Sequence, residues 1–70
     1  MSIKKELLDE LTEKQLRELA EHKGIKFILS DTQKKYYAGW DEKDKLVDIM
    51  SEKENITVRN IEEFLKLHTN

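Results

Sequence analysis

Basic side chains are concentrated in the middle of this 70-residue chain, where they would be able to contact phosphate groups. Residues 22–38 contain four lysines and one aspartate and carry a net charge of +3, whereas the whole chain carries −2. Each lysine or arginine that contacts a nucleic-acid phosphate releases condensed counterions, which favours binding. The alternative is that these are ordinary solvated charges, balanced by nearby glutamates. The predicted contacts are Lys14, Arg17, Lys23, Lys26, Lys34, Lys35 and Lys43.

Two adjacent tyrosines, Tyr36 and Tyr37, directly follow Lys34 and Lys35. An aromatic ring can stack on any unpaired base, because every base has a π-face. Adjacent positions of a helix point about 100° apart, so one ring is expected to pack inward while the other faces solvent. Tyr36 is the candidate stacking residue, and packing in the core or at its rim is the alternative for both rings. Trp40, the only tryptophan, is expected to anchor the core.

The chain lacks the residue patterns of catalytic and metal sites. It has no cysteine, which excludes disulfides and thiolate ligands. Its two histidines, His22 and His68, have no recognised metal-ligand spacing with each other or with carboxylates. Nucleophile elbows, phosphate-binding glycine loops and His-Glu-x-x-His motifs do not occur. We therefore expect no enzymatic activity, no metal and no cofactor.

Aliphatic residues at helical spacing predict an all-α fold of four to five short helices in a single domain, residues 1–70. Ser2 is expected to cap the first helix. Thr12 and Gln15 form a capping-box pattern, which predicts a second helix from about Glu13 to Lys23. A break at Thr12 is preferred over one helix that continues through it. Further helix starts are predicted at Ser30 or Asp31, at Asp41 and at Thr57.

Gly24 suits the end of the second helix, where a left-handed backbone is needed. The following stretch, Ile25–Leu29, has β-branched and aromatic residues, and it is predicted to be extended or a short strand without a partner. The residues expected to form one core are Leu11, Leu16, Leu19, Ile25, Trp40, Leu46, Val47, Ile61 and Phe64.

Two stretches carry a family resemblance: Leu11–Ala20 followed by Gly24-Ile25, and Gly39–Met50. They are similar to the two halves of a SAP domain, which joins two helices by an extended loop and typically binds DNA or RNA. The resemblance covers about residues 11–50 and implies a helix–extended loop–helix core with helical extensions at both ends.

This chain departs from that family in two respects. The connection from Ile25 to Ala38 is longer than the usual loop and is expected to contain its own short helix. The helix after Gly39 begins with acidic residues, whereas nucleic-acid-binding members tend to be basic there. The second half also resembles degenerate SAP-like modules of RING-type ubiquitin ligases, which need not bind nucleic acid.

The expected function is a small nucleic-acid-binding module that contacts mainly phosphates of DNA or RNA and therefore has weak sequence specificity. The alternative is a protein–protein interaction module with a degenerate SAP-like fold, which the negative net charge favours. No apolar stretch exceeds three residues, so no membrane span is expected. We expect a monomer inside the cell, nuclear in a eukaryote and cytoplasmic otherwise.

Overall fold

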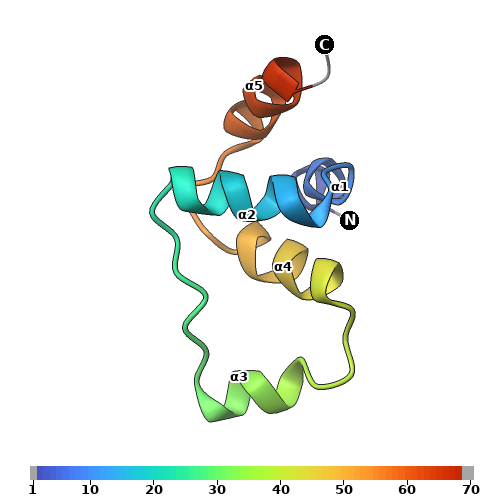
Figure 1. Ribbon diagram of the computed structural model, residues 1–70, viewed down its shortest axis with the longest axis vertical. Helices are drawn as coiled ribbons and strands as arrows, with labels where there is room; N and C mark the ends of the chain where they lie inside the picture. The colour runs from blue at the N-terminus through green and yellow to red at the C-terminus, as the bar shows by residue number, and fades with distance from the viewer. Residues whose placement is uncertain (1, 69–70) are drawn as a thin grey trace.

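The computed structural model describes residues 2–68, without the side chain of His68, and contains five short helices. Within these residues there is no strand, so the predicted all-α fold is confirmed. Figure 1 shows the helices in order along the chain. They are α1 (Ile3–Asp9), α2 (Glu13–His22), α3 (Asp31–Tyr36), α4 (Glu42–Ser51) and α5 (Val58–His68).

Serine or threonine side chains cap the N-termini of four of the helices, at the positions that the sequence predicts. Ser2 Oγ accepts a hydrogen bond from a backbone N–H in the first turn of α1. Thr12 and Ser30 each exchange hydrogen bonds with the glutamine three positions later, so Ser30 rather than the adjacent aspartate caps α3. Thr57 exchanges the same pair with an asparagine. Asp41 occupies the N-cap position of α4, but its side chain accepts no capping hydrogen bond.

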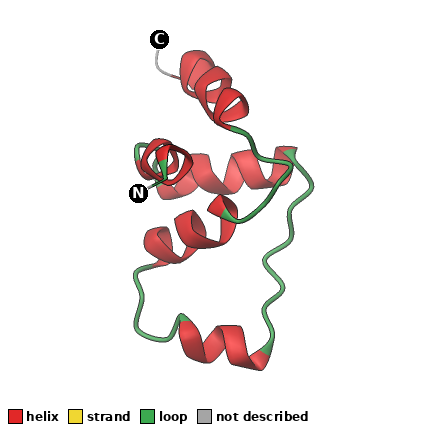
Figure 2. Cartoon of the chain, turned by 180° about the vertical axis from the view of Figure 1, so that it is seen from behind, coloured by secondary structure: helices red, strands yellow, loops and turns green. Residues whose placement is uncertain are grey.

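The core lies where α1 packs on α4 and α5, and where α2 packs on α4 (Figure 2). Most of the predicted core residues are buried there, and Ile25 and Phe64 are partly buried against them. Ile56, in the loop after α4, completes the core although no helical spacing marks it. The buried cluster consists of Leu8, Leu11, Leu16, Leu19, Ala20, Leu46, Val47, Met50, Ile56 and Ile61.

Gly24 ends α2 with φ of 70°, as predicted. The amide of Ile25 donates to the carbonyl of Ala20 at 2.8 Å, and the amide of Gly24 donates to that of Glu21 at 3.0 Å. This pair of bonds satisfies the last carbonyls of the helix and is the Schellman arrangement. It turns the chain out of α2 and into the extended segment.

Replacing Gly24 by valine is expected to destabilise the fold by about 1–2 kcal/mol, because an L-residue with a Cβ is strained at positive φ. A Cβ at this position would have no heavy atom within 4 Å, so steric crowding of the Cβ would not contribute to the destabilisation. Gly24→Asn is the matched control, since asparagine tolerates this conformation better. The midpoint of thermal unfolding should be highest for the wild type, lower for Gly24→Asn and lowest for Gly24→Val. Equal midpoints for Gly24→Val and the wild type would contradict the strained turn.

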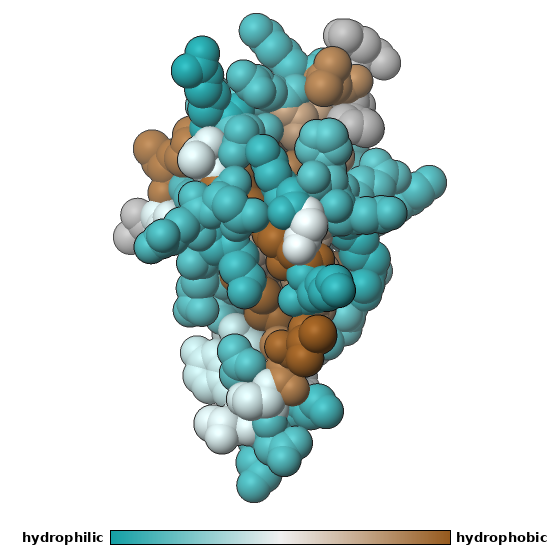
Figure 3. Space-filling view, turned by 90° about the vertical axis from the view of Figure 1, so that its left-hand side faces the viewer, coloured by the Kyte–Doolittle hydropathy of each residue, from teal (hydrophilic) through white to brown (hydrophobic). Residues whose placement is uncertain are grey.

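The segment after Gly24 is extended but forms no strand, because no neighbouring strand is present within residues 2–68. Its side chains alternate: Ile25 and Phe27 pack against the core, whereas Lys26 and Ile28 are exposed. Figure 3 looks onto the side of the molecule that carries this segment, and apolar surface runs down the middle of that side.

Helix α3 stands apart from the other four helices. Figures 1 and 2 both show it at the opposite end of the molecule from α5, reached by the extended segment and by the connection to α4. No residue of α3 itself is buried. The molecule is accordingly elongated, with extents of 38 × 22 × 21 Å.

Candidate nucleic-acid interface

The basic arm, defined as residues 23–40, contains the extended segment, α3 and the turn that follows it (Figure 1). Its two ends are fixed by glycines, Gly24 and Gly39, both of which have positive φ. The side chain of Asn55 donates to the carbonyl of Lys23 at 3.2 Å, which ties the start of the arm to the loop after α4.

The four lysines of the arm are available to an anionic ligand. Lys26, Lys34 and Lys35 are exposed, and Lys23 is half-buried. Across residues 2–68, none of these four ammonium groups lies within ion-pair distance of a carboxylate. Lys34 and Lys35, which are consecutive in the sequence, both lie in the last turn of α3.

The two tyrosines divide as predicted, one exposed and one buried. The Tyr36 side chain, next to Lys35, is 63% exposed, whereas Tyr37 is only 8% exposed. Trp40, however, is 39% exposed, so the expectation that it anchors the core is wrong. It packs instead edge-on against Tyr37, with ring centroids 5.1 Å apart, and lies 5.4 Å from the ring of Tyr36. The buried cluster consists of aliphatic residues and a methionine, and the indole lies outside it, among the aromatic rings at the end of the arm.

A hydrogen-bonded bridge holds the end of the arm against the helical bundle. The Tyr37 hydroxyl donates to Asp48 Oδ2 at 2.7 Å, and Lys5 Nζ donates to Asp48 Oδ1 at 3.0 Å. The bridge therefore connects the end of α3 to α4 and α1. The hydrogen bond from Tyr37 lowers the pKa of Asp48, partial burial opposes the shift, and the Lys5 ammonium adds to it. Burial, followed by the contact with Asp48, raises the pKa of Tyr37.

Acid is expected to weaken this bridge. Because folding lowers the pKa of Asp48, the stabilisation is present at neutral pH and is lost as the pH falls below the ordinary carboxyl value of about 3.8. Trp40, whose ring contacts Tyr37, should report the loss as a change in its fluorescence. Far-UV circular dichroism recorded in parallel distinguishes loss of the bridge from global unfolding, because only global unfolding removes the helical signal.

The Asp48→Asn variant should lack this acid transition, because its side chain cannot take up the proton. The control variant Asp41→Asn removes a nearby exposed carboxylate and should retain the transition. If Asp48→Asn showed the same acid change in Trp40 fluorescence as the wild type, the bridge would not be its origin.

The other three predicted contacts lie on the bundle rather than on the arm. Arg17, on α2, pairs with Glu42 at 2.8 Å and with Glu13 at 3.4 Å. Lys43, on α4, lies 4.0 Å from a carboxylate of α1. Lys14 is exposed on α2 and has no ion pair within the described part of the chain. A hydrogen bond from Lys45, opposed by slight burial and aided by the charges of Lys45 and Arg17, lowers the pKa of Glu42.

Sequence reasoning missed the bridge and an open groove beside it. Lys5, Tyr37 and Asp48 come from three separate elements, and no spacing connects them. One signal was present: Asp48 interrupts the run of buried residues from Leu46 to Met50, and a carboxylate in such a run is expected to have a partner.

Comparisons with known proteins supply no family for this chain. No family model matches the sequence, and no curated protein or solved structure is significantly similar to it. Among the described residues, no group of three histidines, aspartates or glutamates is placed to hold a metal ion; the side chain of His68 lies outside them. None of the described helices is long and apolar enough to cross a bilayer.

Proposed function

We propose that this chain is a small nucleic-acid-binding module in which the basic arm contacts phosphates and Tyr36 stacks on an unpaired base. The observation that carries the proposal is that Lys34, Lys35 and Tyr36 are all exposed on the short helix α3, where neither lysine is ion-paired within residues 2–68. Cationic side chains next to an exposed ring are the two components that bind a nucleic-acid strand.

The distribution of charge supports the same surface. Residues 1–21 and 39–70 have net charges of −2 and −3, and several of their basic groups are already paired with carboxylates. The arm is the only basic stretch, and α3 is held away from the acidic helices (Figure 1). An approaching phosphate would therefore meet the lysines of the arm before the carboxylates of the bundle.

The resemblance to SAP domains adds support of a different kind, because that family joins two helices by an extended loop and typically binds DNA or RNA. Lys14, Arg17 and Lys43 would extend the contact surface, although Arg17 and Lys43 must first leave their carboxylate partners. Since phosphates carry no direct sequence information, binding is expected to be weakly specific.

Titration of labelled DNA and RNA at increasing salt tests this function. With three to five phosphate contacts, the slope of log affinity against log salt should be about −2.7 to −4.5 on duplex DNA. The dissociation constant near physiological salt should lie at roughly 10⁻⁴–10⁻⁶ M. Stacking by Tyr36 predicts that single strands bind better than duplexes, and that Tyr36→Leu removes this preference. An affinity independent of salt, or no binding at millimolar oligonucleotide, would contradict the proposal.

A further inference from the structure

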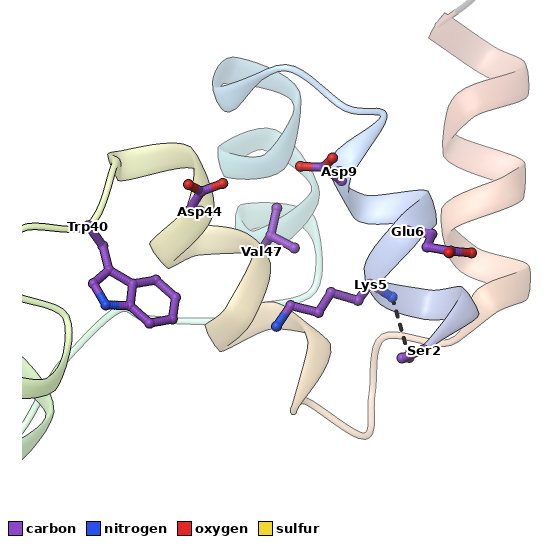
Figure 4. Close-up of a pocket in the computed structure, with 7 residues that line it drawn as sticks. All are labelled: Ser2, Lys5, Glu6, Asp9, Trp40, Asp44 and Val47. Carbon is purple, nitrogen blue, oxygen red and sulfur yellow. Dashed lines mark hydrogen bonds between the residues drawn. The ribbon is translucent and has the colours of Figure 1, made fainter.

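An open groove of about 790 Å³ lies between α1 and α4, and none of its lining residues belongs to α3. Helix α1 and its cap contribute Ser2, Lys5, Glu6 and Asp9, and α4 contributes Asp44 and Val47. Figure 4 shows these side chains, with the indole of Trp40 at one end of the groove. The nucleic-acid proposal uses none of the acidic residues of this groove.

The groove has apolar surface that can hold an aliphatic side chain. Val47, which is 3% exposed, closes the floor, while the residue Trp40 is 39% exposed. Trp40 cannot turn freely, because it packs against Tyr36 and Tyr37. A fixed, half-exposed indole offers both apolar area and a π-face for a cation.

The charges of the groove select a cationic partner. Three carboxylates line it, those of Glu6, Asp9 and Asp44, against the single ammonium group of Lys5. That ammonium is already hydrogen-bonded to Asp48 at 3.0 Å, so it does not offset the three acids. Glu6 and Asp44 have no ion pair within residues 2–68, and Asp9 has only the 4.0 Å contact with Lys43. A phosphate backbone would be repelled here, whereas lysine or arginine side chains would be attracted.

We propose that this groove docks a short protein segment in which lysine or arginine side chains alternate with aliphatic ones. The cationic groups would pair with Glu6, Asp9 and Asp44, and one of them would lie on the face of Trp40. An aliphatic side chain between them would cover Val47. The proposed contacts include no lysine of α3, so the proposal does not depend on nucleic-acid binding by the arm.

Trp40 is the only tryptophan, so its fluorescence reports directly on the groove. The probe is the peptide acetyl-Lys-Leu-Lys-Leu-Lys-amide, titrated at low salt while Trp40 emission and amide shifts are followed. We expect saturable changes at Trp40 and along α1 and α4, and none with the matching glutamate peptide. Sedimentation of the free protein as a dimer through this groove would show a second copy as the occupant and would overturn the proposal.

A pair of charge-matched variants separates the groove from net charge. Glu6→Gln with Asp44→Asn removes two carboxylates of the lining, and should weaken peptide binding about three- to tenfold. Glu21→Gln with Glu62→Gln removes two exposed carboxylates that do not line the groove, and should leave binding unchanged. Equal weakening by both pairs, shifts located elsewhere, or no change at millimolar peptide would overturn the proposal.

Discussion

The Leu19→Ala variant is expected to lose about 2–5 kcal/mol of unfolding free energy. Leu19 is 2% exposed and belongs to the buried cluster between α2 and α4, so truncation leaves a cavity as well as removing apolar contacts. A domain of this size has a thin core and a small margin of stability. The loss is therefore expected to leave a large fraction of the variant unfolded at 37 °C. Chemical denaturation followed by circular dichroism measures the unfolding free energy of both proteins.

Ile28→Ala provides the matched control for this loss. Ile28 is 81% exposed, so removing its side chain should change the stability by less than about 0.5 kcal/mol. Similar denaturation midpoints for Leu19→Ala and wild type would contradict the packing of α2 described above.

The second large effect is expected from reversing two charges of the arm, in the variant with Lys34→Glu and Lys35→Glu. Both residues are exposed and without ion pairs in the described structure, so folding should be unaffected. Loss of two phosphate contacts should reduce the salt slope on duplex DNA by roughly 1.8. Affinity at low salt should fall by about tenfold or more, measured by anisotropy of a labelled oligonucleotide.

A variant with Arg59→Glu and Lys66→Glu changes the net charge equally on α5, where both side chains are exposed. It should bind nucleic acid nearly as well as the wild type if the arm is the contact surface. Comparable losses in the two variants would mean that the net charge, rather than the arm, governs binding.

The helices were predictable because their signals are local. Thr12, Ser30 and Thr57 each bond within three positions, so the residue types alone indicate where a helix begins. The signal at Gly24 is equally local, because glycine has no Cβ and adopts the positive φ of a helix end without strain. The core residues of α2 and α4 followed from helical spacing.

The contacts that shape the candidate site depend on residues far apart in the sequence. Arg17 pairs with Glu42 across 25 positions, and Lys5 with Asp48 across 43. Whether a lysine or arginine is free for a ligand is decided by such pairs, which composition cannot show. The error at Trp40 has a related origin: a large aromatic residue favours burial, but Trp40 lies outside the buried cluster and packs on Tyr36 and Tyr37 instead.

The most direct test of the basic arm as a nucleic-acid interface is a map of amide chemical shifts during titration with a short single-stranded oligonucleotide at low salt. The structure predicts that the largest shifts cluster at Lys26 and along α3, including Lys34, Lys35 and Tyr36, while α5 remains unchanged. Shifts confined to α5, or to the groove between α1 and α4, would contradict this assignment.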